Sequence, residues 1–364
     1  MPVSVVVGGQ FGSEGKGKVA LELSRQTRAA AVVRPGGTNS GHTGVASDGQ
    51  MHALRQLPAA ALTQDAFVIL PPGALIDIDL LNQEIEQVGL APERLKISPM
   101  ATVISDEDRQ AEQDGGLIEA IGSTGSGTGA ALQRRILRQN TGAAIQAEGY
   151  PSLKPYLTDT TALIRSLLNE DKHVVVEGTQ GFGLSVLHGG FYPKATSRDT
   201  TAGAFISEAG LSPVDVTEVI LVIRTFPIRV AGDSGPLENE MTWAEVAKNA
   251  ELPPDFHELT SATKKIRRVG KFDPEIVRRA IAANNPTKIV LNHLDYVDPS
   301  VKTDTMCPRA VSFIEKVERE IGQPIDWIGP DPEKIVPRSD FTDHVAAADS
   351  EPARDFEMAA PAGI

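Results

Sequence analysis

Apolar and β-branched residues gather in six short runs, separated by stretches whose apolar residues recur at helical spacing. A short apolar run between turn signals is typical of a buried strand, whereas apolar positions three and four apart predict a helix. Strands alternating with helices predict an α/β fold on a mostly parallel, doubly wound sheet. The predicted strands are 3–7, 31–34, 67–70, 173–177, 218–225 and 288–292, and the clearest predicted helices are 80–88, 156–169, 243–250 and 276–283.

Three stretches rich in Gly, Ser and Thr interrupt this alternation, at 35–44, 122–129 and 178–203. Long loops in a compact domain tend to be functional, and parallel sheets bind ligands beyond the carboxyl ends of their strands. We therefore expect one large catalytic domain over residues 1–339, with its site on these loops. Residues 340–364 are rich in Ala, Pro, Asp and Glu without periodicity, which predicts a flexible tail.

Composition excludes several classes of protein. The net charge of −13 argues against non-specific nucleic-acid binding, and no apolar run reaches the length of a membrane span. The chain enters a predicted strand at once, so no signal peptide is expected. The single cysteine, Cys307, excludes an internal disulfide framework, and there is no Cys/His cluster with zinc spacing. These features favour a cytoplasmic protein without a nucleic-acid or membrane partner.

Residues 8–18, GGQFGSEGKGK, lie between the first predicted strand and a predicted helix. From Gly12 to Lys18 they have the G-x-x-x-x-G-K spacing of a phosphate loop, whose backbone N–H groups form an anion site at a helix N-terminus. The next residue is Val19, where that motif has a hydroxyl for magnesium. The loop predicts phosphate binding, and a plain tight turn is the alternative.

Two further loops carry candidate ligand contacts. Residues 34–43, RPGGTNSGHT, hold Asn39 and His42 on glycine-flanked backbone, and a histidine can act as a general acid or as a donor to an oxyanion. Residues 121–138 are a second glycine-rich stretch followed by Arg134, Arg135 and Arg138. They predict a second phosphate site, or else a hinge before a solvated basic helix.

Three later segments add polar candidates. Residues 174–203 contain Gln180 and Thr196. The cations of residues 259–273 could hold a dicarboxylate, and a solvated helix end is the alternative. Residues 290–298, VLNHLDYVD, end a strand in Asn-x-x-Asp, which resembles the base-reading end of a guanine-nucleotide site.

Together and in this order, these loops resemble those of the adenylosuccinate synthetase family. The resemblance rests on GGQFGSEGKGK, GGTNSGHT, IGSTGSGTG, VEGTQG, YPKATSRDTTAG, RRVGKFD and LNHLD. It implies a single large α/β domain, related to phosphate-loop enzymes, in which a nucleoside triphosphate phosphorylates the 6-oxygen of IMP. The amine of L-aspartate then displaces the phosphate. The resemblance also implies that Mg²⁺ sits on a first-loop acid and a glycine carbonyl, at the positions of Ser13 and Gly41.

The resemblance assigns the remaining roles by position. His42 matches the residue that stabilises the 6-oxyanion, and Lys16 matches the lysine on the triphosphate. Arg138 matches an arginine that reaches the monophosphate of the neighbouring subunit, which implies a homodimer. The expected triphosphate contacts are Ser13, Glu14, Gly15, Lys16, Gly17, Lys18, Gly41, His42, Thr43, His293, Leu294 and Asp295. The expected monophosphate contacts are Ser13, Asn39, Ser123, Thr124, Arg138, Gln180 and Thr196, and the expected aspartate contacts are Thr263, Lys265 and Arg267.

Ser13 is the departure that bears most on the substrate. In the family that the chain resembles, an aspartate there takes the purine N1 proton and helps hold magnesium, and a serine of unperturbed pKa cannot act as that base. The chain is then an inactive relative, an IMP enzyme with a relocated base, or an enzyme for a purine that needs space beside N1. Guanine carries its 2-amino group there. The chain is similar to a bacteriophage branch of the family, PurZ, which has serine in the same QFGS context and condenses dGMP with aspartate.

Two further departures concern the other substrates. His293-Leu294-Asp295 keeps the aspartate of the Lys-Leu-Asp stretch with which cellular members read guanine, but loses its lysine. The bacteriophage branch is associated with ATP or dATP. Lys265 stands where the cellular enzymes have arginine, and this exchange is not conservative at a bidentate site.

The sequence predicts a homodimeric, Mg²⁺-dependent ligase of the cytoplasm, which is the host's if the chain is phage-encoded. It would condense dGMP with L-aspartate, driven by ATP or dATP through a 6-phosphoryl intermediate, to N6-succino-2-amino-2′-deoxyadenylate for 2-aminoadenine nucleotide synthesis. Ser13 and His42 are the predicted catalytic residues. The alternatives are an ordinary IMP- and GTP-dependent adenylosuccinate synthetase and a non-catalytic nucleotide-binding relative.

Overall fold

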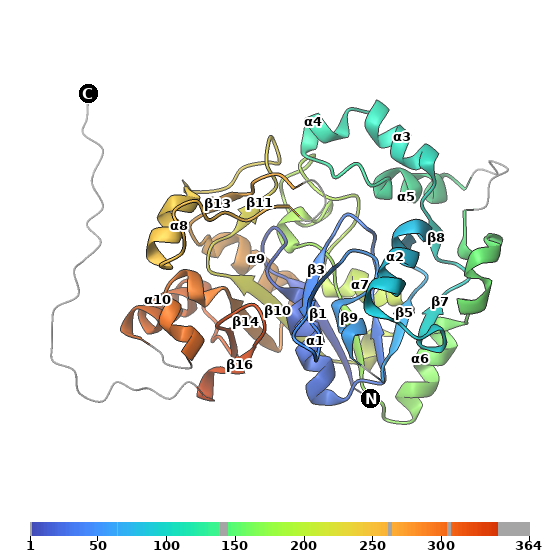
Figure 1. The fold of residues 1–364 in the computed structure, drawn as a ribbon, viewed down its shortest axis with the longest axis horizontal. Helices are drawn as coiled ribbons and strands as arrows, with labels where there is room; N and C mark the ends of the chain where they lie inside the picture. Colours follow the sequence, from blue (N-terminus) through green and yellow to red (C-terminus); the bar gives the residue numbers. More distant parts are fainter. Residues whose placement is uncertain (1, 64, 139–144, 261–263, 304–306, 341–364) are drawn as a thin grey trace.

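A nine-stranded sheet forms the centre of the protein, with helices on both of its faces (Figure 1). The computed structural model describes residues 2–63, 65–138, 145–260, 264–303 and 307–340. Neighbouring strands are parallel except for the pair β15 and β16 at one edge. In spatial order the strands are β16 (Val336–Pro337), β15 (Trp327–Gly329), β14 (Lys288–Asn292), β10 (Val216–Arg224), β1 (Val3–Gly8), β9 (Val174–Glu177), β2 (Ala31–Val33), β5 (Phe67–Leu70) and β7 (Leu95–Ile97).

Strand β1 shows why both faces of the sheet are covered. Successive side chains of a strand point to opposite faces, and Val5 and Val6 accordingly belong to two different hydrophobic clusters. The Val5 cluster includes residues of α6 (Thr160–Asn169), α7 (Ala202–Ala209), α9 (Pro274–Asn284) and α10 (Pro308–Ile321). The Val6 cluster includes residues of α1 (Lys16–Thr27) and α2 (Ile78–Val88). The predicted doubly wound α/β fold is confirmed.

The strongly periodic elements lie close to where the sequence predicts them. All six predicted strands are present within two residues at either end. The helix predicted at 156–169 begins only at Thr160, because the Asp159 side chain accepts a hydrogen bond from Ala162 N and caps the first turn. The helix predicted at 243–250 is α8 (Trp243–Asn249).

The short elements around the site were not predicted. A hairpin joins β3 (His42–Val45) to β4 (Met51–Leu54). A three-stranded sheet has the order β11 (Ile228–Arg229), β13 (Arg268–Gly270) and β12 (Glu240–Met241). A third small sheet pairs β6 (Leu75–Ile76) with β8 (Thr102–Val103). Strands of two to four residues carry no readable periodicity. Three helices lie together beyond the sheet in Figure 1: α3 (Asp106–Asp114), α4 (Leu117–Ile121) and α5 (Thr128–Leu137).

Within the described residues, no helix is long and apolar enough to cross a bilayer. Two calls from the sequence fall outside those residues. They are the predicted tail, apart from Asp340, and the expected aspartate contact Thr263.

Candidate active site

The loop after β1 wraps around its own carboxylate. Glu14 is fully buried and accepts hydrogen bonds from Gln10 N at 3.1 Å and Gly12 N at 2.8 Å. Its other oxygen accepts from Lys16 Nζ at 2.7 Å. Gly15 has a φ of 91°, a left-handed conformation that glycine adopts without strain, and α1 starts at the next residue. The expected triphosphate lysine is thus held by Glu14 at the N-terminus of α1.

A cavity of about 240 Å³ opens beside this loop. Segments distant in sequence form it: the first loop, the 39–41 stretch, α4 with the loop behind it, and the segments near residues 180, 196, 230 and 267. The site residues expected from the sequence that line it are Ser13, Asn39, Gly41, Ser123, Thr124, Gln180, Thr196, Lys265 and Arg267. Apart from Arg138, and from Thr263 outside the described residues, the structure therefore brings together the residues predicted for the monophosphate and for aspartate.

Other expected residues lie apart from the cavity lining. Lys18 Nζ donates to the Asp331 carbonyl at 2.7 Å, and burial lowers the pKa of Lys18 to about 8. Arg138 is exposed at the C-terminal end of α5, outside the cavity lining. This placement suits a contact to another subunit, which stays a prediction. The remaining expected residues absent from the lining are Glu14, Gly15, Lys16, Gly17, His42, Thr43, His293, Leu294 and Asp295.

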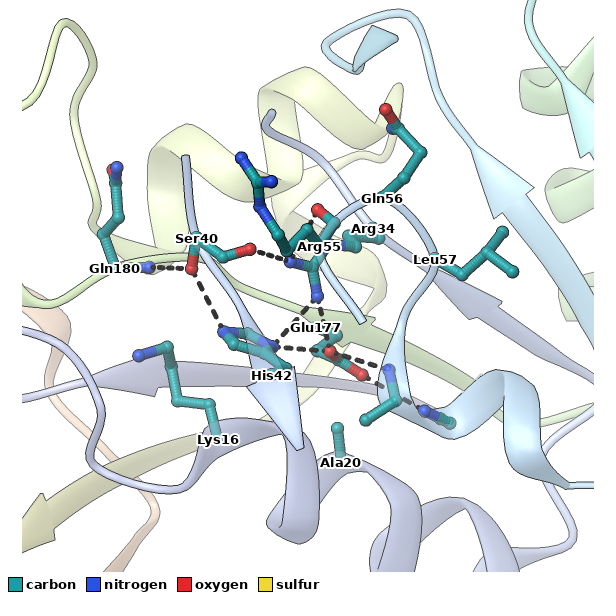
Figure 2. A network of polar contacts seen from close by, with 12 residues as sticks. Lys16, Ala20, Arg34, Ser40, His42, Arg55, Gln56, Leu57, Glu177 and Gln180 are labelled. Atoms are coloured by element: carbon teal, nitrogen blue, oxygen red, sulfur yellow. Dashed lines mark hydrogen bonds and ion pairs between the residues drawn. The ribbon is translucent and has the colours of Figure 1, made fainter. Parts of the chain in front are cut away.

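His42 lies behind the cavity wall in a buried polar network (Figure 2). Its Nδ1 is 2.6 Å from Glu177 Oε1, and Arg34 Nη1 donates to the same oxygen at 2.9 Å. The Ala59 amide also donates to this carboxylate. Glu177 ends β9 and Arg34 directly follows β2, so the two neighbouring strands meet at their carboxyl ends. Burial and the Arg34 charge lower the pKa of His42 to about 4, against the raising effect of Glu177.

The second glycine-rich loop differs from the anion cradle that the sequence suggests. The Glu112 carboxylate accepts from Gly127 N at 2.9 Å and from Gly129 N at 2.7 Å, so it occupies two of the amides at the start of α5. The basic residues of α5 are partly structural: Arg134 binds Asp108, and Arg135 binds main-chain carbonyls. Ser123 and Thr124 line the cavity before these amides.

Thr196 offers a polar atom without a partner. Its Oγ1 is buried and has no hydrogen-bond partner among the described residues. A buried polar atom left unpaired is costly, so this hydroxyl on the cavity wall points to a polar ligand.

Glu258, a carboxylate not singled out from the sequence, holds two arginines near the residues predicted for aspartate. Glu258 binds Arg224 Nη2 at 2.5 Å and accepts from Tyr296 Oη at 3.0 Å. Arg267 Nη1 lies 3.4 Å from its other oxygen. Despite burial, the Arg224 charge holds the pKa of Glu258 down at about 2. Glu258 thus organises the two arginines and remains ionised.

A second polar cluster lies where β14 and β15 end. Asp295 Oδ2 is 3.2 Å from Lys302 Nζ, and burial raises the pKa of Asp295. Asn292 Nδ2 donates to the Glu14 carbonyl at 2.7 Å, whereas the buried Asn292 Oδ1 has no partner among the described residues. The predicted base-reading Asp295 is therefore paired with a lysine outside the Asn-x-x-Asp motif.

Five functional candidates were not singled out from the sequence: Arg34, Glu177, Arg224, Glu258 and Lys302. Three of them end or follow apolar runs, and a charge in that position was the one signal that could have indicated them. Glu258 and Lys302 carry no such signal, since only the fold brings them to their partners.

A mostly parallel sheet with a glycine-rich loop after its central strand, beside a cavity formed by several loops, defines a doubly wound α/β protein. Comparison with known proteins makes this specific. The sequence model of the adenylosuccinate synthetase family matches residues 5–148 and 143–303, and the chain belongs to that family. Members of this family are ligases that join aspartate to a purine nucleotide through a C–N bond.

Adenylosuccinate synthetases of archaea are similar to the chain over most of its length. The chain is 36% identical to adenylosuccinate synthetase of Pyrococcus horikoshii over 350 residues, covering 93% of this chain and 99% of the relative. It is 38% identical to that of Thermococcus onnurineus over 352 residues, with 93% and 99% covered.

Two solved structures share the fold. Fully ligated adenylosuccinate synthetase from Plasmodium falciparum superposes with a TM-score of 0.81 at 21% identity, with 93% of this chain and 100% of that chain covered. The cyanophage S-2L succinoaminodeoxyadenylate synthetase, PurZ, bound to dGMP and dATP, has a TM-score of 0.77 at 27% identity, with 92% and 95% covered.

Proposed function

We propose that this ligase condenses dGMP with L-aspartate, driven by ATP or dATP, to N6-succino-2-amino-2′-deoxyadenylate. The observation that carries the proposal is Ser13, which lines the cavity where the family has an aspartate. A serine side chain is shorter than a carboxylate and leaves room for the 2-amino group of guanine beside N1. The likeness to the cyanophage enzyme that binds dGMP and dATP supports the proposal.

The chain's own residues divide the work as follows. Asn39, Ser123, Thr124, Gln180 and Thr196 bind the monophosphate, and Lys265 and Arg267 bind the carboxylates of aspartate, together with Thr263. Lys16 leaves its ion pair with Glu14 and binds the triphosphate. His42 stabilises the 6-oxygen as it attacks the γ-phosphoryl group once its Nε2 carries a proton, since donors in a dry site stabilise developing charge. Arg138 completes the monophosphate site of a second subunit in a homodimer, and the enzyme acts in the cytoplasm.

The residues present fit a magnesium ion that is carried largely by the substrate. Gly41 can offer a carbonyl oxygen and Ser13 a hydroxyl, and both are hard oxygen ligands. Among the described residues, no group of three Asp, Glu, His or Cys side chains could hold a metal ion by itself. Mg²⁺ is commonly bound this way, through few protein oxygens and through substrate phosphates. When bound, the ion would neutralise phosphate charge.

Phosphate release with ATP, Mg²⁺ and aspartate, compared between dGMP and IMP, tests the proposal. Turnover with dGMP and not with IMP is the expected result. An ordinary IMP- and GTP-dependent synthetase is the second candidate, because identity to the archaeal enzymes exceeds identity to the cyanophage enzyme. Turnover with IMP alone would establish that candidate, and nucleotide binding without turnover would indicate a non-catalytic relative.

A further inference from the structure

Ser40 connects the cavity to His42. It lines the cavity, and its Oγ is 3.4 Å from His42 Nε2 and accepts from the Gln180 amide at 3.4 Å. On the far side of the imidazole, Nδ1 is 2.6 Å from Glu177 Oε1. Figure 2 shows the three side chains in series, from Ser40 through His42 to Glu177. The order is hydroxyl, imidazole, carboxylate.

The hydrogen bonds of this series decide where the protons are. An ionised carboxylate only accepts, and the hydrogen bond from His42 and the Arg34 charge lower the pKa of Glu177 despite its burial. The shorter contact, 2.6 Å to Glu177, assigns the shared proton to His42 Nδ1, and Arg34 Nη1 lies 3.0 Å from the same nitrogen. In a neutral imidazole the other nitrogen is then an acceptor, so Nε2 can accept the Ser40 hydroxyl proton.

Ser13 has no comparable support. Among the described residues, no imidazole or carboxylate is hydrogen-bonded to its Oγ, whereas its main-chain carbonyl accepts from Arg224 Nη1. The carboxylate on the cavity wall, Glu112, is bound to two backbone amides. A hydroxyl can accept a proton at neutral pH only if it passes its own proton to a base behind it.

We propose that Ser40 is a catalytic residue that supplies the base function absent at Ser13. In the first half-reaction the purine N1–H proton moves to Ser40 Oγ as the Ser40 hydroxyl proton moves to His42 Nε2. The electron pair of the N1–H bond forms the N1–C6 double bond while the C6–O π pair moves to the 6-oxygen, which bonds to the γ-phosphorus of the nucleoside triphosphate as the nucleoside diphosphate leaves. This inference rests on the proposed function for its step, but it holds for either purine substrate.

The surroundings of His42 suit a transient proton. Glu177 Oε1 and Arg34 Nη1 lie 2.6 Å and 3.0 Å from His42 Nδ1. The carboxylate favours a positive charge on the imidazole, whereas the guanidinium opposes a lasting one. The imidazolium formed during the step is paired with Glu177 and is positioned to return its proton.

Ser40→Ala tests the relay, measured with whichever purine monophosphate the unaltered enzyme turns over. We expect kcat to fall about 100-fold, the lower end of general acid–base contributions, with KM for the monophosphate within threefold. Ser40→Thr keeps the hydroxyl and should restore most of the rate. Ser24→Ala, which removes a buried hydroxyl bonded to Ala20 O on α1, is the matched control and should leave kcat unchanged.

A double variant separates the relay from an independent contact. Residues that act as one unit are strongly non-additive, so Ser40→Ala combined with His42→Gln should be no slower than His42→Gln alone. If the losses of kcat in the two single variants multiply in the double variant, the proposal is overturned. A Ser40→Ala kcat within threefold of that of the unaltered enzyme, or a change in KM only, would also overturn it. The identity of the active monophosphate decides the proposed function separately, because the Ser40→Ala ratio does not depend on it.

Discussion

Arg224 Nη1 donates to the main-chain carbonyl of Ser13 at 3.0 Å, so a buried cation at the end of β10 holds the residue on which the proposed substrate depends. Ser13 has a φ of 57°, a left-handed conformation that is uncommon for a residue other than glycine. The same guanidinium binds Glu258. The Ser13 backbone is therefore linked through the Arg224 and Glu258 side chains to Arg267, which lines the cavity.

Exchange of Ser13 for aspartate should reverse the substrate preference. In Ser13→Asp we expect kcat/KM for dGMP to fall at least tenfold and that for IMP to rise, because the carboxylate occupies the space of the 2-amino group and provides a base at N1. Steady-state phosphate release with both nucleotides measures this. An unchanged ratio would mean that another residue selects the purine. Ser13→Ala, which keeps the space, should retain the preference for dGMP.

Loss of the Glu258 charge should destabilise the fold. Arg224 is fully buried, and removing one partner of a buried pair leaves an uncompensated charge at a cost of about 3 kcal/mol. We expect Glu258→Gln to lower the free energy of unfolding by that amount, measured by urea denaturation. Glu240→Gln is the control, because Glu240 pairs with Arg268 in a more exposed position and should cost less than about 1 kcal/mol. Equal losses in the two variants would contradict this account.

Acid should destabilise the protein between about pH 6.5 and pH 4. Burial lowers the pKa of His42 from 6.5 to about 4. In that window the unfolded chain binds a proton that the folded chain does not, so stability is fully present above pH 6.5 and falls as pH falls. Denaturation at several pH values should show a shallower dependence for His42→Gln. Some slope should remain, since burial also lowers the pKa values of His173 and His293.

Lys302 should influence the choice of triphosphate. Bidentate recognition of guanine N1–H and its 2-amino group needs both oxygens of Asp295, and Lys302 lies 3.2 Å from one of them. In Lys302→Ala we expect kcat/KM for GTP relative to ATP to rise about tenfold, within the range of a bidentate base contact. Lys316→Ala removes an exposed lysine of α10 and should leave the ratio unchanged. An unchanged ratio in Lys302→Ala would place base selection elsewhere.

The elements predicted best from the sequence were those with the strongest local pattern of apolar residues. The runs at 67–70 and 288–292 became β5 and β14 with identical bounds, because apolar β-branched residues between turn signals leave few alternatives. The hairpin of β3 and β4 and the three-stranded sheet of β11, β13 and β12 were missed. Their strands are two to four residues long and pair through contacts that no local pattern records.

The sequence by itself determined the α/β class, the order of the main strands and helices, the family and the loops that carry the site, since each depends on local periodicity or on motifs of adjacent residues. Only the tertiary structure decided how these loops meet. It placed Glu177 against His42, Ser40 between His42 and the cavity, Glu112 on the amides of the second loop, and Glu258 against Arg224. Between 2 and 135 residues separate these partners. Their contacts arise because a parallel sheet brings the carboxyl ends of distant strands to one edge, and buried charges there must find partners.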